Sequence, residues 1–169
     1  MTKIKAIPGG LGNTAILFLS EDTGMTDSIS ATMIADHHHC DQLLATFEGR
    51  VAAKDWGQAV GEGQGLAAAL LDHFAREEQR LFPELLAVDP HAGGPVQVMT
   101  LEHRQMRALL ADLEGAIGKR DADECLGLVE TLHFLIQQHN AKEEGILYPL
   151  ADQGLGSRAA GLLDQLRAS

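Results

Sequence analysis

The sequence predicts an all-α protein: an antiparallel up-down four-helix bundle made of two repeated helical hairpins, with a short extra helix at the C-terminus. Two observations lead to this fold class. From residue 27 onward, alanines, leucines and acidic residues recur at spacings of three and four, the pattern of amphipathic helices. The second half of this region repeats the first at an offset of 66 residues. Short links within each repeat make neighbouring helices antiparallel.

Helix-breaking segments set the limits of each element. They lie near Lys54 and Asp55, at "VDPHAGGP" (88–95), near Lys119 and Asp121, and at "DQGLGS" (152–157). The predicted helices therefore span roughly residues 27–52, 56–87, 95–118, 122–151 and 157–167. We assign residues 26–169 to the bundle and residues 1–25 to an N-terminal tail, in which "TAILFLS" is a candidate short strand.

The composition narrows the classes of partner. The chain of 169 residues is 45% hydrophobic, which suits one domain with a sizeable core. Its 24 acidic residues outnumber 13 lysines and arginines, and the net charge of −11 argues against binding to nucleic acid or to an anionic membrane. No apolar run approaches the roughly 20 residues that cross a bilayer. With two cysteines and no Cys-x-x-Cys spacing, we expect a cytoplasmic, reduced protein, and leave open whether it is a homodimer.

The repeat aligns the residues that can carry chemistry. The segment "DHFAREEQRLFPEL" (72–85) lies over "QHNAKEEGILYPLA" (138–151), and the same offset continues backward without a gap. It pairs histidine with histidine and glutamate with glutamate: His73 with His139, Glu77 with Glu143, and His37 with His103.

The histidine run in "ADHHHCDQLL" (35–44) supplies only one of these candidates. The offset of 66 places His38 and His39 on Arg104 and Gln105, which are polar surface types. His37 alone shares a helix face with apolar neighbours, so we expect the other two histidines to be solvated or to lie just outside the ligand set.

In each repeat, a His-x-x-x-Glu pair stands on a helix face that is otherwise apolar, and residues four apart share a face. A buried carboxylate without a partner is costly, and a metal cation removes that cost. Imidazole and carboxylate suit iron, manganese or zinc, and facing helices of a bundle are where dinuclear carboxylate sites are built. The alternative is a pair of exposed faces that bond to nearby lysines and arginines. The expected ligands are four histidines and two glutamates that bridge two ions: His37, His73, Glu77, His103, His139 and Glu143.

These motifs resemble those of the hemerythrin-like (His-His-Glu, HHE) cation-binding domain. The segments "HFAREEQRLFP", "EHRQMR" and "HNAKEEGILYP", preceded by "DH" on the first helix, carry the resemblance over roughly residues 28–151. It implies a hemerythrin-like four-helix bundle and a di-iron centre: two iron ions joined by carboxylate and oxo or hydroxo bridges. It places the ligands at the same six residues, with zinc or manganese as the other candidate metals.

Departures from the family pattern bear on the function. Oxygen-carrying hemerythrins have a further histidine one turn away on the third helix, where this chain has Met99 and Arg107. Di-iron proteins that repair iron–sulfur clusters usually carry an N-terminal segment with a cysteine, and residues 1–25 contain none. Oxygen carriers also place a bridging carboxylate five residues after the last histidine, which makes Glu144 an alternative to Glu143.

Three further residues have a less direct link to the site. Cys40 is expected to pack in the core, with a thiolate near the metal as the alternative. Tyr148, which lies over Phe82 in the repeat, is expected to pack rather than to bond to the site. Glu78 is expected outside the ligand set or on the surface, where Arg76 or Arg80 neutralises it.

Three functions fit this sequence. The first is binding or sensing of a small molecule such as O2 or NO, or handling of iron. Methionines and leucines on the interior faces favour it, because they predict a dry pocket with no general base beyond the ligands. The second is a di-iron enzyme of the peroxidase, ferroxidase or iron–sulfur repair type, so enzymatic activity is left undecided. The third is a structural metal site that only holds the bundle together.

Overall fold

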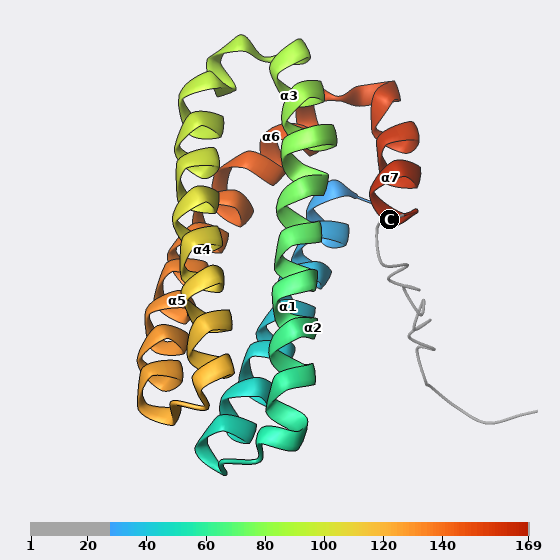
Figure 1. Ribbon diagram of the computed structural model, residues 1–169. Coiled ribbons are helices and arrows are strands. Elements are labelled where there is room, and N and C mark those ends of the chain that lie inside the picture. The colour runs from blue at the N-terminus through green and yellow to red at the C-terminus, as the bar shows by residue number, and fades with distance from the viewer. Residues whose placement is uncertain (1–27, 169) are drawn as a thin grey trace, which may run out of the picture.

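The computed structural model describes residues 28–168, which form helices and no strand. The four long helices are α1 (Ile29–Ala52), α2 (Trp56–Arg76), α4 (Gly93–Lys119) and α5 (Ala122–Lys142). Figure 1 shows them side by side as a helical bundle, in which α1 packs against α2 and α5, and α4 packs against α5 and α2. The all-helical prediction is therefore confirmed.

The two links between paired helices follow the sequence repeat. Lys54 ends the turn after α1 and Arg120 the turn after α4, and both have φ of 55°, in the left-handed region. The two positions are related by the offset of 66 residues. At the start of α5, the side chain of Asp121 accepts a hydrogen bond from the N–H of Glu124 and caps the helix. The repeat thus extends to the backbone conformation of the links.

Each of the predicted helices 56–87 and 122–151 is interrupted by one turn of π-helix. The first turn, η1, spans Glu77–Leu81 and the second, η3, spans Glu143–Leu147. The N–H of Phe82 donates to the carbonyl of Glu77, five residues earlier. A proline follows each turn in the next helix and has no N–H to donate to the carbonyl four residues back, which favours this wider turn. Such turns are frequent at functional sites.

Short helices close the end of the bundle that lies away from the two links. They are α3 (Phe82–Val88), α6 (Tyr148–Gly154) and α7 (Ala159–Arg167), with 3-10 turns η2 (Pro90–Ala92) and η4 (Gly156–Arg158). The predicted helix 157–167 corresponds to η4 and α7. Helix α7 packs against α1 and η1 and buries three leucines there: Leu162, Leu163 and Leu166.

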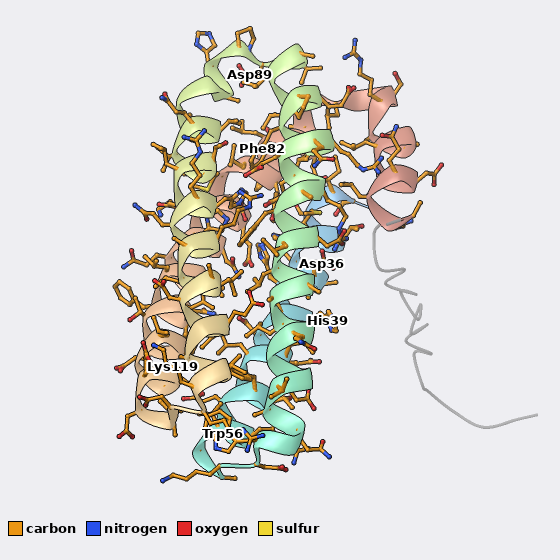
Figure 2. The ribbon with its side chains drawn as sticks, viewed as in Figure 1. Asp36, His39, Trp56, Phe82, Asp89 and Lys119 are labelled. Carbon is orange, nitrogen blue, oxygen red and sulfur yellow. The ribbon has the colours of Figure 1, made fainter. Side chains whose placement is uncertain are left out.

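The core consists of two apolar clusters with a polar layer between them. One cluster lies toward the links and includes Phe47, Leu66 and Leu132. The other lies toward α3, α6 and α7 and includes Leu85 and Leu163. Charged and polar side chains from all four long helices and both π-turns meet between the two clusters, as Figure 2 shows at mid-height of the bundle.

The predicted tail, residues 1–25, and its candidate strand lie outside the described residues. Among the helices between residues 28 and 168, none has the length and apolar character needed to cross a membrane.

Candidate metal centre

The structure brings the six predicted ligands together in the polar layer. Each comes from a different helix or π-turn: His37 from α1, His73 from α2, Glu77 from η1, His103 from α4, His139 from α5 and Glu143 from η3. All six are buried, with exposed fractions between 0% and 3%. We call these six residues the central cluster. Their role as ligands remains a prediction; their convergence is observed.

The histidines of the central cluster form one pair in each hairpin. The Nε2 atoms of His37 and His73 lie 3.1 Å apart, and those of His103 and His139 also lie 3.1 Å apart. The angle between the two ring planes is 61° in the first pair and 60° in the second. The offset of 66 residues therefore describes an approximate twofold symmetry of the site itself.

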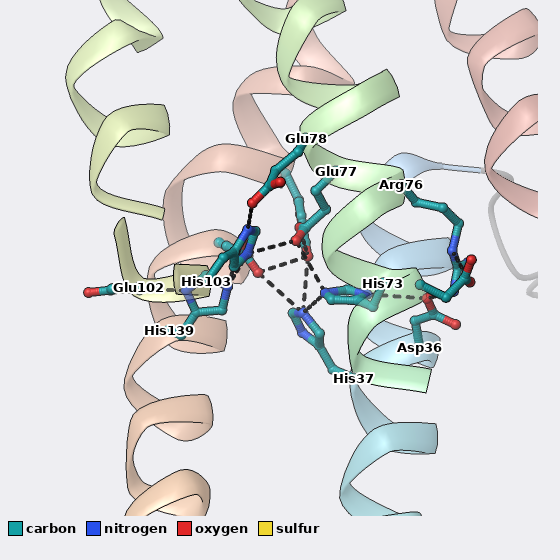
Figure 3. A network of polar contacts seen from close by, with 12 residues as sticks. Asp36, His37, His73, Arg76, Glu77, Glu78, Glu102, His103 and His139 are labelled. Atoms are coloured by element: carbon teal, nitrogen blue, oxygen red, sulfur yellow. Dashed lines mark hydrogen bonds and ion pairs between the residues drawn. The ribbon is translucent and has the colours of Figure 1, made fainter. Parts of the chain in front are cut away.

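The two carboxylates each contact histidines of both hairpins. Glu77 Oε2 lies 3.4 Å from His73 Nε2 and 3.2 Å from His103 Nε2. Glu143 reaches His37 Nε2 with Oε2 at 3.3 Å and His139 Nε2 with Oε1 at 3.1 Å. Figure 3 shows these contacts crossing the space between the histidine pairs. This is the arrangement expected of carboxylates that bridge two metal ions.

The nitrogen and oxygen atoms of the central cluster do not satisfy one another by hydrogen bonding, and a metal ion would satisfy them. Glu77 Oε2 and Glu143 Oε1 are fully buried and accept no hydrogen bond of proper geometry. A buried carboxylate oxygen in this state is costly unless a cation compensates it. Two overlapping groups have ligand atoms within 4.8 Å of one another: Glu77, His103, His139 and Glu143, and His37, His73 and Glu143. The site can therefore hold metal through histidine and glutamate.

Neighbouring side chains shift the pKa values of His139 and Glu143 in the metal-free protein. Burial lowers the pKa of His139, but the close contact with the negatively charged Glu143 outweighs burial and raises that pKa to about 9. Burial raises the pKa of Glu143, yet the close contacts with His139 and His37 hold it well below its usual value. A metal ion that binds to these side chains would therefore compete with protons for them.

Four carboxylates outside the central cluster each form a hydrogen bond with the Nδ1 atom of one of its histidines. We call them the outer carboxylates. Asp36 Oδ2 lies 3.2 Å from His73 Nδ1, and Glu102 Oε2 lies 3.0 Å from His139 Nδ1. The remaining two contacts are 2.8 Å each, from Glu144 Oε1 to His37 Nδ1 and from Glu78 Oε1 to His103 Nδ1. These bonds fix the tautomer that presents Nε2 to the centre, as in known metal sites.

The sequence analysis missed two of the outer carboxylates, although a signal was present. Asp36 and Glu102 are related by the same offset of 66, and each directly precedes a central histidine of its helix. Glu78 and Glu144 form the second related pair, and each directly follows a central glutamate. The repeat therefore aligns ten acidic and imidazole groups, not six.

Cations neutralise three of the outer carboxylates. Arg76 pairs with Asp36, and Lys142 pairs with Glu102 at 2.5 Å. Burial raises the pKa of Glu102. The hydrogen bonds from Lys142 and His139 lower this pKa by more than burial raises it, so the net shift is downward. These outer pairs keep the carboxylates ionised and able to accept from imidazole.

The fourth outer carboxylate, Glu144, breaks the symmetry with its equivalent in the first repeat, Glu78. Glu78 accepts from both guanidinium nitrogens of Arg107, at 2.8 Å and 3.0 Å. The prediction of Arg76 or Arg80 as its partner is wrong, because Arg76 instead pairs with Asp36. The residue related to Arg107 by the repeat is Asp41, which cannot neutralise Glu144. Glu144, with 36% of its side chain exposed, bonds to His37 from the rim of the site. The structure thus places Glu143 in the centre and Glu144 outside it.

Two other sequence expectations can be compared with the structure. Cys40 is buried in the apolar cluster near the links, where burial raises its pKa to about 12 and keeps the thiol neutral. It belongs to neither group of clustered ligand atoms. His38 and His39 are exposed on the outer side of α1, and Figure 2 shows His39 at the edge of the bundle.

Tyr148 departs from its expected packing role. Its side chain is fully buried, and its hydroxyl lies 2.7 Å from Glu77 Oε1, 3.0 Å from Glu143 Oε2 and 3.0 Å from His37 Nε2. Burial and the charges of the two glutamates hold its pKa well above the usual value in the metal-free protein. The sequence signal was the one polar difference from Phe82, its equivalent in the first repeat.

Comparison with known proteins gives one result. The family model described as the hemerythrin HHE cation binding domain matches residues 28–151. No curated protein and no solved structure matches the chain.

Proposed function

Because the chain belongs to the hemerythrin HHE cation-binding domain family, we propose that its central cluster holds two iron ions in a non-haem di-iron centre. His37 and His73 would hold one ion, His103 and His139 the other, and both glutamates would bridge them. The single observation that carries this proposal is that each buried glutamate contacts histidines of both hairpins. We take the four long helices as an up-down antiparallel bundle around this centre.

Iron is the proposed metal because the donor set is mixed. Imidazole and carboxylate together suit iron, manganese and zinc, and in helical bundles such sets commonly hold paired redox metals. The family resemblance adds an oxo or hydroxo bridge between the ions. Zinc has no redox chemistry, so a zinc-loaded native protein would contradict the O2 or NO binding role proposed next.

The proposed role is binding or sensing of a small molecule such as O2 or NO. A di-iron centre, when bound, supplies open coordination positions and electrons for such a diatomic ligand. The chain's own residues exclude water around it: Phe74 stacks on His103 with ring centroids 4.3 Å apart, and Met33 and Met99 are buried nearby. The outer carboxylates are all engaged with imidazole nitrogens, so none of these four is free to act as a general base for turnover.

Optical spectra test this function. Iron-loaded, reduced protein should develop charge-transfer bands with O2 or NO that disappear when the gas is removed. Bands that decay with turnover of a reductant or peroxide would point instead to an enzyme. An iron-loaded protein whose spectrum does not respond to either gas would contradict the binding role and favour a structural metal.

The outer carboxylates give a separate prediction. Glu102→Ala removes the acceptor of His139 Nδ1 and leaves Lys142 unpaired, so iron affinity should fall roughly 10–100-fold, as for other partners of metal-bound histidine. The matched control is Glu114→Ala, the same change at an exposed position of the same helix, α4. Competition with a chelator measures both affinities. Equal affinities would show that the outer carboxylate does not support the centre.

A further inference from the structure

The approximate twofold symmetry of the centre fails at one buried position. Phe82 and Tyr148 are related by the offset of 66, directly follow equivalent π-turns and are both buried. Phe82 presents only a ring to its half of the site, nearly parallel to that of His103 at a centroid distance of 6.0 Å. Tyr148 presents an oxygen atom. The two halves therefore differ by one donor.

The phenol oxygen has more close neighbours than one hydroxyl can satisfy. Its distances to two carboxylate oxygens, of Glu77 and Glu143, are 2.7 Å and 3.0 Å. A hydroxyl carries one proton, so it can donate to only one of these two acceptors. The other contact brings two oxygen atoms together without a proton between them, which is unfavourable in a buried site. A shared cation would make both contacts favourable.

The spacing of these atoms is that of donors around one ion. Donor atoms at roughly 2.0–2.2 Å from a metal and at right angles to each other lie about 3 Å apart. The Tyr148 oxygen is 2.7–3.0 Å from Glu77 Oε1, Glu143 Oε2 and His37 Nε2, all of them donor atoms of the central cluster. The contact with His37 assigns the phenol to the half of the site that includes His73, which lies 3.1 Å from His37.

We propose that Tyr148 is a seventh protein ligand, bound through its oxygen to the ion that His37 and His73 hold. This inference rests on the proposed di-metal centre. On metal binding the phenolic O–H bond breaks, an oxygen–metal bond forms, and the proton leaves to solvent. The ion held by His103 and His139 has Phe82 in the equivalent place and gains no such donor, so the two ions are inequivalent.

The sequence makes this testable in the full chain, because Tyr148 is its only tyrosine. Iron(III)-loaded protein should show a visible phenolate-to-iron charge-transfer band, and Raman excitation in that band should enhance phenolate ring vibrations. Tyr148→Phe should lose both signals and keep two irons per chain. Phe82→Leu, the matched control in the other half of the site, should keep the charge-transfer band and the phenolate vibrations.

Loading with gallium(III) gives a reading that needs no variant. This ion has no visible bands, so a tyrosinate difference spectrum in the ultraviolet would report the bond directly. Two irons per chain without phenolate vibrations, or vibrations that persist in Tyr148→Phe, would overturn the assignment and leave the di-iron centre intact. Protein that holds less than about one metal per chain would remove the proposed function and this inference together.

Discussion

Replacing His37 with alanine is expected to strip iron from the protein, whereas replacing His38 leaves the iron content unchanged. His37 is buried among the donor atoms, with Nε2 at 3.1 Å from His73 and 3.3 Å from Glu143. Loss of a ligand should cost at least the roughly 10–100-fold in affinity that loss of an outer partner costs. Metal analysis of both variants, purified from iron-replete cells, measures the effect.

The His38→Ala control is matched because the two histidines are adjacent on α1 and differ in orientation. His38 is exposed, so its loss removes an imidazole without touching the central cluster. Equal iron content in the two variants would contradict the assigned geometry, and so would a larger loss in His38→Ala.

Removing the metal should lower the melting temperature by roughly 10 °C at neutral pH. A ligand at about 1,000 times its dissociation constant stabilises the fold by about 4 kcal/mol. For a chain of this size each kcal/mol shifts the melting temperature by about 2–4 °C. Calorimetry of the metal-free and iron-loaded proteins gives the difference.

The difference in melting temperature between the iron-loaded and the metal-free protein should widen as the pH rises from about 6.5 to about 9. In the metal-free protein the pKa of His139 is raised from 6.5 to about 9 by Glu143, against the effect of burial. Protonation of His139 stabilises the metal-free fold fully at pH values below the pKa of the unfolded state. This stabilisation is lost as the pH rises through the pKa of the folded state. In the loaded protein the ring binds metal instead of a proton, so that loss does not occur. A gap that narrows over this range would contradict metal binding by His139.

The sequence predicted the all-helical bundle and the six residues that converge in the central cluster because both depend on periodicity. The apolar spacing defined the long helices, and the offset of 66 put three pairs of titratable residues in register, such as His73 with His139. The structure brings all six together in one buried layer. Helical faces and an internal repeat are properties of sequence order alone, so no tertiary information was needed.

The features that the sequence did not predict depend on tertiary contact. The π-turn at Glu77–Leu81 has the same apolar pattern as a continued α-helix, and only its hydrogen bonds distinguish the two. Asp36 and Glu102 look like ordinary polar residues until a histidine on another helix reaches them. Tyr148 and Phe82 differ by one hydroxyl, whose importance depends on which donor atoms surround it.

Anomalous diffraction at the iron edge from crystals of the iron-loaded protein tests the central claim most directly. Two iron peaks per chain are expected, one beside His37 and His73 and one beside His103 and His139, with Glu77 and Glu143 between them. One peak, or peaks away from these side chains, would contradict the di-iron centre.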